Sequence, residues 1–230
     1  VRRQAIANGT ANREAAKAFP DSFQETEELG WIPEGWEVST IGEECETVGG
    51  GTPSTKNPDF WADGTYPWVT PKDFSSLQDK VLLSSSRYLT EAGLAKVSSG
   101  LLPEGTVLMS SRAPVGYLAI TQIETAINQG FIGVICNQRL PSEYVLQWAN
   151  SRMVDIKQAS SGSTFAEISK RTFRPFKVIV PQAEALEAYQ EIATAAYSRI
   201  ADNVAASETL GSLRDTLLPK LISGELRIDA

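Results

Sequence analysis

The chain of 230 residues contains no histidine, and this absence removes several classes of active site. Without histidine there is no Ser-His-Asp or Cys-His nucleophile system, and the commonest protein ligand of transition metals is missing. Enzymes that depend on carboxylates, lysine or a bound cofactor pass this filter. We therefore expect no metal site, and we regard catalysis as restricted but not excluded.

Cysteine and long apolar runs are also scarce. Cys45 and Cys136 are the two cysteines of the chain, lie 91 positions apart and belong to no CxxC pair, which favours two buried thiols in a reducing cytoplasm. No apolar run approaches the length of about 18 residues that a membrane helix needs. The chain begins with Val1 and its first residues are polar and charged, so we expect a cytoplasmic piece of a longer protein without a secretory signal.

The net charge of −7 is unevenly distributed. Residues 1–48 hold 4 basic and 10 acidic side chains, residues 49–180 hold 13 and 10, and residues 181–230 hold 4 and 8. The basic excess is greatest in residues 151–180, with 6 basic and 2 acidic side chains. This distribution favours DNA contact by the middle block and protein contact by the acidic ends. The alternative is an ordinary scatter of solvated charge.

The pattern of apolar residues in the sequence changes at Pro181. Before it, short strand-like runs are broken by Gly, Pro, Ser and Thr without a βαβ rhythm, which predicts an α+β fold. After it, an apolar stripe predicts one helix over about residues 182–218, roughly 55 Å long. The sequence thus divides into a leader (1–30), a globular domain (31–180) and a long helix (181–230). Within these parts we expect a linker over residues 20–30 and a helix over 142–158 that Ser142 caps.

The predicted long helix carries a heptad-like seam that Asn203 and Ser207 interrupt. The positions of this seam are alternately three and four residues apart. Its apolar members are Leu186, Tyr189, Ala193, Ala196, Ile200, Leu210 and Leu217. The length favours pairing with a helix from another segment or chain, and the alternative is packing on its own domain. We expect Pro219 to kink or end the helix and Gly224 to let the chain turn.

The glycine loop at residues 49–55 reads GGGTPST. It lacks the lysine of a Walker phosphate loop and the spacing of a dinucleotide fingerprint. We predict that its amides and hydroxyls touch a DNA backbone, with a plain turn as the alternative. The following NPDF (residues 57–60) is close to the [DN]PP[YF] element of amino-methyltransferases, but Asp59 replaces its second proline. A degenerate adenine methyltransferase fragment is therefore one alternative function.

Two further groups are candidates for DNA contact. Arg112, between a strand and a tight turn at Ala113 and Pro114, can reach a guanine edge or a phosphate, or it can pair with a carboxylate. The polar and basic cluster in residues 163–174 suits phosphate contact, with a solvated face as the alternative. Tyr66 and Trp68 are expected in the core. All residues predicted to contact DNA are Thr52, Ser54, Thr55, Lys56, Lys72, Ser110, Ser111, Arg112, Tyr117, Ser163, Thr164, Lys170, Arg171 and Arg174.

Seven segments, taken in order, resemble one known family. They lie within residues 31–228 and read IPEGWEVSTIGE, GGGTPST, GTYPWVTPKD, GTVLMSSRAPVGYLAI, AINQGF, GSTFAEISK and LRDTLLPKLISGELRI. Each segment is weak evidence, but the ordered set resembles the specificity (S) subunit of type I restriction-modification systems. Members usually hold two target recognition domains, each followed by a long helix, and the helices pair as an antiparallel coiled coil. This chain resembles the C-terminal half of such a subunit.

The resemblance implies a recognition subunit without catalytic residues. It implies that the chain reads one part of a bipartite target in double-stranded DNA and docks methyltransferase (M) subunits, to which restriction (R) subunits are added. It further implies that S-adenosylmethionine, ATP and Mg belong to those partners, and that this chain pairs with another half subunit or with its own copy. A protein-interaction module that does not bind DNA is the remaining alternative.

Overall fold

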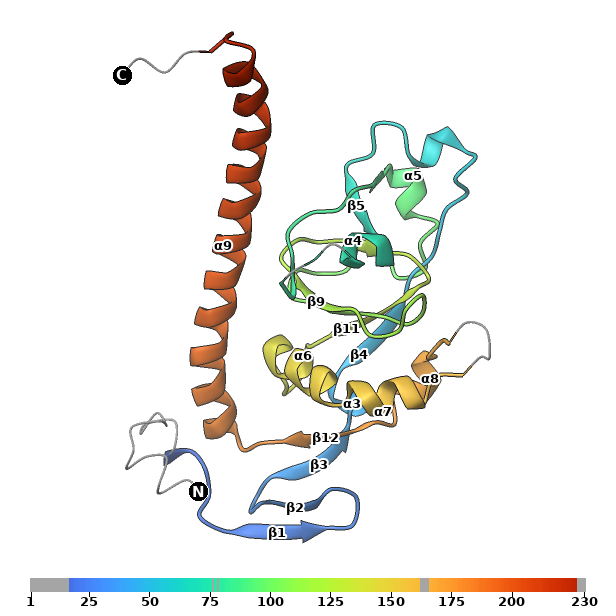
Figure 1. Ribbon diagram of the computed structural model, residues 1–230. Helices are drawn as coiled ribbons and strands as arrows, with labels where there is room; N and C mark the ends of the chain where they lie inside the picture. Colours follow the sequence, from blue (N-terminus) through green and yellow to red (C-terminus); the bar gives the residue numbers. More distant parts are fainter. Residues whose placement is uncertain (1–16, 76, 78, 162–165, 227–230) are drawn as a thin grey trace, which may run out of the picture.

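The computed structural model describes residues 17–75, 77, 79–161 and 166–226. Figure 1 shows a body of short strands and helices with one long helix, α9, along its side. The fold is α+β, as the irregular order of strands and helices predicts. In the described parts of the chain, no helix is both long and apolar enough to cross a membrane.

A five-stranded sheet forms the centre of the body, in the order β4-β11-β8-β9-β6. Its strands are β4 (Glu46–Gly49), β11 (Phe131–Ile135), β8 (Val107–Ser110), β9 (Leu118–Thr121) and β6 (Val81–Leu82). Neighbours are antiparallel except β6 and β9, which are parallel. Since β4 lies beside β11, loops far apart in the sequence meet at the ends of adjacent strands.

The two faces of this sheet bury different cores, because successive side chains of a strand point to opposite faces. On one face Met109, Ile132 and Val134 pack with the apolar side of helix α6 (Ser142–Ser151). On the other face Leu108 and Phe131 join a second core. The sheet is therefore covered on both sides, which explains the nearly continuous apolar runs of its strands.

Smaller sheets flank the centre. Strands β10 (Ala126–Ile127), β5 (Tyr66–Val69) and β7 (Tyr88–Leu89) form one of them. Strands β3 (Glu37–Thr40) and β12 (Lys177–Val180) form another. Trp68 is buried in a third core that Tyr66 packs against, which confirms both predicted core positions.

A hairpin of β1 (Phe23–Thr26) and β2 (Gly30–Pro33) precedes the body. The prediction of a linker over residues 20–30 is therefore wrong for the part that forms β1. The hairpin holds because Ile32, opposite Gln24, is buried and anchors the ribbon. The part of the predicted leader before residue 17 lies outside the described residues.

Short helices connect the strands. They are α3 (Ile41–Glu44), the 3-10 helix η1 (Pro58–Phe60), α4 (Pro71–Ser75), α5 (Glu91–Leu94), α7 (Met153–Gln158) and α8 (Lys170–Phe173). The single helix predicted over residues 142–158 is two helices, α6 and α7, that meet at Arg152. The predicted cap is also wrong, because Ser142 is the first helical residue and its hydroxyl donates to the Gly105 carbonyl (2.6 Å).

An ion pair ties α3 to the segment after β11. Nε of Arg139 lies 3.0 Å from Oε2 of the buried Glu44, and its Nη1 lies 2.7 Å from Oε2 of Glu37. The hydrogen bonds from Arg139 lower the pKa of the Glu44 carboxyl below its usual value of 4.5, against the opposing effect of burial. A buried carboxylate is stable here because it is paired.

The long helix α9 (Ala183–Ile222) has 40 residues and would span about 60 Å. Its start agrees with the prediction, but Pro219 does not end the helix, which continues through it to Ile222. Pro219 has no amide hydrogen to donate within the helix. Its carbonyl still accepts a helical hydrogen bond from the Ser223 amide (2.9 Å). Gly224, with φ of +74°, ends the helix as expected, since glycine adopts positive φ without strain.

Candidate nucleic-acid interface

Four segments meet at one end of the central sheet, and we call this surface the loop face. They are residues 49–56 after β4, 111–117 between β8 and β9, 128–130 before β11, and 166–171. The Ser111 amide donates to the Gly130 carbonyl (2.7 Å), and the Ile168 amide donates to the Ser111 carbonyl (3.0 Å). The antiparallel order of β4, β11, β8 and β9 thus brings the predicted DNA-contacting segments together.

The glycine loop is fixed from behind by two indoles. Nε1 of Trp68 donates to the Gly51 carbonyl, and Nε1 of Trp61 donates to the Ser54 carbonyl, each at 3.0 Å. The guanidinium carbon of Arg87 lies 3.7 Å from the ring centroid of Trp61 and 5.1 Å from that of Trp68, so a cation–π contact supports both rings. These contacts use the inner carbonyls and leave the outer side chains of the loop exposed.

The exposed side chains of this loop are the predicted ones. They are Thr52, Ser54, Thr55 and Lys56. Gly50 is required by close approach, because a Cβ there would overlap the carbonyl of Ile127. The loop therefore presents hydroxyls and one ammonium group on a backbone that is held in place.

Sequence reasoning missed Gln129. Its exposed side chain accepts a hydrogen bond from the Thr52 hydroxyl, which joins residues 128–130 to the glycine loop. The adjacent Asn128 is half-buried, and its Oδ1 accepts from the Gly130 amide (2.8 Å). Amide side chains suit adenine edges in the major groove, and the available signal was the polar pair directly before a buried strand.

The turn between β8 and β9 uses two of the predicted residues internally. Ser110 is buried; its hydroxyl donates to the Pro114 carbonyl (2.7 Å) and accepts from the Tyr117 amide (2.8 Å). Ser111 is buried as well. The prediction that these two serines contact DNA is therefore corrected, because both are buried. The Ser110 hydroxyl closes the turn, since a short hydroxyl side chain readily bonds to nearby backbone.

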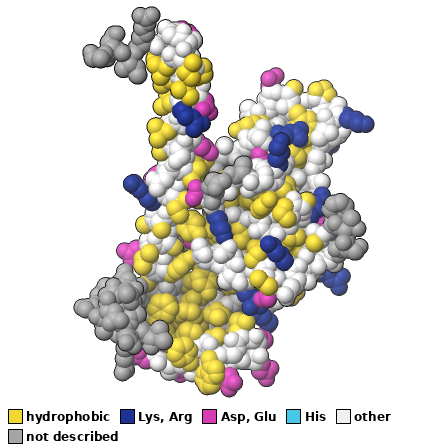
Figure 2. All heavy atoms as spheres, in the orientation of Figure 1, with side chains coloured by type: hydrophobic (Ala, Val, Ile, Leu, Met, Phe, Trp, Pro, Cys, Tyr) yellow, Lys and Arg dark blue, Asp and Glu magenta, His cyan; other side chains and the backbone are white. Residues whose placement is uncertain are grey.

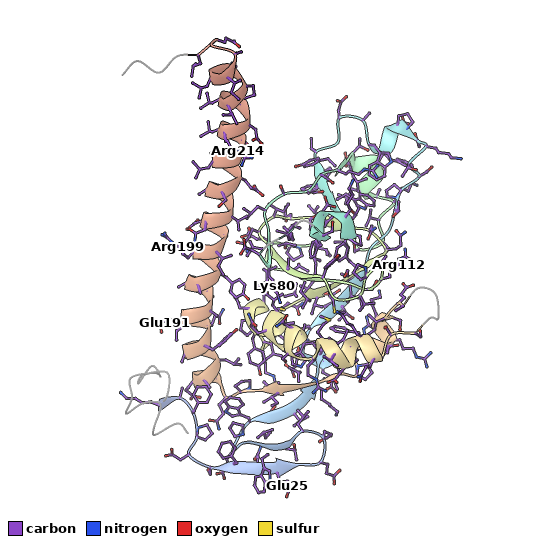
Figure 3. The ribbon with its side chains drawn as sticks, in the orientation of Figure 1. Glu25, Lys80, Arg112, Glu191, Arg199 and Arg214 are labelled. Carbon is purple, nitrogen blue, oxygen red and sulfur yellow. The ribbon has the colours of Figure 1, made fainter. Side chains whose placement is uncertain are left out.

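Arg112 stays at the surface of this turn. Its Nη1 lies 3.7 Å from Oε2 of Glu167, so the alternative of a carboxylate partner is correct for this conformation. Figure 3 shows Arg112 on the side of the body away from α9. Its pairing leaves contact with DNA as a prediction, since both side chains remain partly exposed.

Two other predicted residues border the loop face. Tyr117 is half-buried and packs against the second core, so only part of its ring is accessible. Lys72 is exposed on α4, next to Pro71, whose ring would lie 3.1 Å from a Cβ built on Gly130. The ammonium group of Lys72 therefore belongs to the helix beside residues 128–130.

The residues of the polar and basic cluster at 163–174 differ in their surroundings. Lys170 and Arg171 are exposed on α8, whose first turn is capped by the Ser169 hydroxyl. Lys170 lies at the start of the glycine loop, with Nζ 3.4 Å from a Cβ built on Gly49. Arg174 instead donates from Nε to Oγ1 of Thr47 (2.6 Å) and from Nη2 to the Thr47 carbonyl (3.0 Å). Thr47 thus holds the guanidinium of Arg174, which stays exposed, and its phosphate contact stays a prediction. Ser163 and Thr164 lie outside the described residues.

The NPDF segment forms a local cap. The Asn57 side chain accepts from the Asp59 amide (3.1 Å) at the start of η1, where Pro58 occupies the first turn. An asparagine committed to its own backbone is a turn residue. The described residues contain no group of three or more His, Cys, Asp and Glu side chains arranged to hold a metal ion.

Figure 2 shows how charge lies on one side of the molecule. Lys and Arg side chains are scattered over the body, and acidic side chains occur along α9 and at the hairpin end. The basic groups form separate spots in this view. Basic side chains also lie on α9 and acidic ones on the body, so this view does not separate a basic body from acidic ends.

The first half of α9 packs against its own body. Leu186 and Ala193, predicted to pair with another helix, are each only 8% exposed. The rings of Tyr144 and Tyr189 meet edge to face, with centroids 5.7 Å apart. Burial raises the pKa of both phenols to about 12. For this half the alternative of packing on the same domain is correct, because the adjacent face of α6 is apolar.

The second half of α9 leaves its apolar seam uncovered. Leu210 is 66% exposed, and the exposed apolar residues that continue this seam and its borders are Leu213, Leu217, Leu218 and Ile222. Ala196 is exposed and Ile200 is half-buried, so the change from covered to uncovered seam residues occurs near the middle of α9. In Figure 1 the upper part of α9 extends beyond the body. The large apolar side chains of the predicted pairing seam that are exposed, Leu210 and Leu217, therefore lie in this half.

A match to one protein family shows to which family this chain belongs. Residues 33–201 match the model described as the type I restriction modification DNA specificity domain. The chain belongs to this family. The match includes the whole loop face and the packed half of α9, and the family is one of DNA recognition rather than catalysis.

Related specificity subunits support this assignment. The chain is 36% identical over 174 residues to the MjaIX specificity subunit of Methanocaldococcus jannaschii, which covers 75% of this chain and 39% of the relative. It is 30% identical over 163 residues to the EcoR124I/EcoR124II specificity subunit of Escherichia coli, covering 68% and 39%. The chain therefore spans about two fifths of the length of these relatives.

Solved structures share the fold. The HsdS subunit from Thermoanaerobacter tengcongensis superimposes with a TM-score of 0.55 at 20% identity, covering 98% of this chain and 52% of that one. A type I system S subunit from M. genitalium gives 0.55 at 14% identity, covering 82% and 46%. The chain has the extent of about half of these structures.

Proposed function

We propose that this chain is one half of a type I specificity subunit and reads one part of a bipartite DNA target. The match of residues 33–201 to the DNA specificity domain carries this proposal. The globular body (31–180) would recognise the bases, and the long helix (181–230) would assemble the complex. Residues 1–30 would connect the body to the remainder of a longer subunit.

The loop face is the proposed DNA-contacting surface. Thr52, Lys56, Lys170 and Arg171 supply exposed donors that suit phosphates, which position a protein on the duplex. Arg112 and Gln129 carry the forked guanidinium and amide groups that suit guanine and adenine edges. Backbone contacts and base contacts would therefore come from adjacent segments of one surface.

The open half of α9 is the proposed assembly surface. Apolar side chains at Leu210 and Leu217 are seven positions apart, which is the repeat of a coiled coil. A second helix would bury them, supplied by the other half of a longer subunit or by another copy of this chain. The methyltransferase and restriction subunits would then dock on the paired helices, bringing S-adenosylmethionine, ATP and Mg with them into a cytoplasmic complex.

The proposal is tested by giving the chain its methyltransferase. The chain is co-expressed with the methyltransferase subunit of the same system in a host without DNA methylation, and methylated adenines are mapped across the genome. Methylation at one short motif is the expected result. A spaced palindrome would show that two copies act together, because two-fold symmetry in the protein produces a symmetric site.

A matched control separates recognition from assembly. The N-terminal half of a full-length specificity subunit is added to the same cells when the chain alone directs no methylation. Methylation at a split motif would then show that this chain reads one part and requires a partner for the other. No methylation in either arm, with all subunits present in the purified complex, would contradict the recognition role.

A further inference from the structure

The two cysteines of the chain lie face to face at the end of two neighbouring strands. The register of β4 and β11 pairs Thr47 with Val134 and Glu46 with Ile135. Continued by one residue beyond the paired strands, this register places Cys45 opposite Cys136. Their sulfurs are 4.0 Å apart, although the residues are separated by 91 positions in the sequence.

Both thiols point to the same side of the sheet. Cys45 belongs to the core that contains Val134 and Ile132, and Cys136 packs against that core. Directly opposite residues of an antiparallel pair have Cα atoms roughly 4.5–5.5 Å apart, within the range of about 4.4–6.8 Å that a disulfide spans. Rotation of the side chains is therefore enough to bring the sulfurs to the bonding distance of about 2 Å.

The two thiols differ in access. Cys45 is 2% exposed, whereas Cys136 is half-buried, so a small oxidant reaches Cys136 first. The Cys45 thiol donates toward the Cys136 sulfur, and this contact lowers the pKa of Cys136 more than burial raises it. The accessible sulfur is thus the better nucleophile, and the buried one is placed to react second.

We propose that Cys45 and Cys136 are an oxidisable dithiol that a peroxide converts into a cross-strand disulfide. The Cys136 thiol gives up its proton, and the thiolate attacks a peroxide oxygen as the O–O bond breaks. A sulfenic acid forms, and the leaving hydroxide or alkoxide takes up that proton and departs as water or an alcohol. The Cys45 thiol then attacks the Cys136 sulfur, the S–O bond breaks, and water leaves as the S–S bond forms. Two electrons pass from the two sulfurs to the peroxide, and an added dithiol reverses the change.

The disulfide would stabilise the folded body. It closes a chain segment that runs from before β4 to after β11 and contains the other three strands of the central sheet. Closing a long loop restricts the unfolded chain and so favours the folded one. We expect the unfolding temperature of the oxidised chain to rise by about 5 °C or more, without any requirement that the chain bind DNA.

The test uses the purified chain before and after hydrogen peroxide. Reduced and oxidised samples are unfolded, alkylated and weighed by mass spectrometry, and their thermal unfolding is followed with and without dithiothreitol. The expected product is a monomer that has lost two hydrogens, takes up no alkylating agent, contains the Cys45–Cys136 linkage and unfolds at a higher temperature until it is reduced. Cys45→Ala and Cys136→Ala serve as matched controls, because alanine keeps both positions apolar.

The controls also follow the proposed order of reaction. Cys45→Ala should accumulate a sulfenic acid at Cys136 that dimedone traps, whereas Cys136→Ala should keep its buried thiol reduced. Two alkylated thiols in the peroxide-treated wild type, disulfide-linked dimers alone, or a crosslink without a reversible rise in unfolding temperature would overturn the proposal. The comparison of oxidised and reduced wild type does not depend on either variant folding.

Discussion

Nη1 of Arg112 lies 3.7 Å from Oε2 of Glu167, and the two residues also form an isolated antiparallel bridge. Their side chains are 36% and 49% exposed. An ion pair this open to water contributes at most about 1 kcal/mol. The carboxylate therefore orients the guanidinium on the loop face, and a DNA base or phosphate can compete for it.

We predict that Arg112→Ala reduces discrimination between target and altered sequences. Loss of a bidentate contact to guanine should cost about 1–3 kcal/mol for the correct site and much less for the wrong one. Competition binding with the mapped motif and with single-base variants measures this difference. If the variant discriminates between these DNA sequences as well as the wild type does, Arg112 only forms a surface ion pair and does not read the target.

Matched variants isolate the effect of Arg112. Arg199→Ala removes the same charge from α9, on the other side of the molecule in Figure 3, and should leave discrimination unchanged. Glu167→Gln removes the partner carboxylate and keeps the arginine. It should strengthen binding to all DNA sequences at low salt while preserving the preference for the target.

The double variant Lys170→Ala with Arg171→Ala should weaken binding to every sequence to a similar degree. Each lost phosphate contact lowers the steepness of the salt dependence by about 0.9, so the slope of log K against log salt should fall by up to about 2. Titrations at several salt concentrations measure it. Arg214→Ala with Lys220→Ala, both on α9, is the control of equal charge, and an unchanged slope in the α8 variant would exclude this contact.

Gly50→Ala and Gly51→Ala form a matched pair in the glycine loop. A Cβ at Gly50 would overlap the Ile127 carbonyl, whereas one at Gly51 would meet its nearest neighbour at 3.5 Å. We expect Gly50→Ala to destabilise the body by about 1–3 kcal/mol and displace the loop, and Gly51→Ala to change stability by about 0.5 kcal/mol or less. Denaturant unfolding compares them; equal effects would show that the loop does not need its close approach.

The two halves of α9 should respond differently to the same substitution. Leu186→Ala removes a buried side chain and should lower the free energy of unfolding by about 2–4 kcal/mol. Leu210→Ala removes an exposed one and should leave the stability of a dilute monomer nearly unchanged. Denaturant unfolding at low concentration makes this comparison.

Self-association of α9 is then measured separately. Leu210→Asp with Leu217→Asp places charges on the open seam, so any concentration-dependent association should disappear in sedimentation experiments. Glu184→Asp, in the first turn of the helix, is a neutral control. Association that survives the seam variant would place the contact between copies elsewhere.

The Glu44–Arg139 pair should make stability depend on acid. Because the pKa of Glu44 is lower in the folded chain than its usual 4.5, its contribution is fully present above that value and is lost as the pH falls through the folded-state pKa. Glu44→Gln should therefore destabilise the body at pH 7 and flatten its loss of stability below about pH 4.5. Measurements of the free energy of unfolding at pH 7 and below about pH 4.5 test this. Glu191→Gln, at an exposed position on α9, is the control. Parallel pH curves for wild type and Glu44→Gln would contradict it.

Local patterns predicted several parts of the fold correctly. The apolar stripe after Pro181 predicted where α9 begins, and Trp68 was correctly predicted to lie in the core. These predictions succeeded because helix periodicity and burial of large apolar side chains are properties of short segments. The prediction that the helix could end at Pro219 was wrong, because the rest of a long helix outweighs one missing hydrogen bond.

The candidate site was less predictable because a polar side chain has two possible uses. Ser110, Ser111 and Arg174 have the same chemistry as DNA-contacting residues, yet the fold directs two inward and ties the third to Thr47. Gln129, which the patterns did not select, lies exposed beside Thr52. Which donor reaches solvent depends on strand register and not on residue type.

Residue patterns alone predicted an α+β body, a long helix with an apolar seam, the lack of histidine chemistry and the segments that resemble a specificity subunit. The folded chain was needed to show which half of the seam is covered, which polar groups share the loop face, and that Cys45 lies opposite Cys136. The physical reason is range: helix periodicity acts over a few residues, whereas the pairing of β4 with β11 joins residues about ninety positions apart through one ladder of hydrogen bonds.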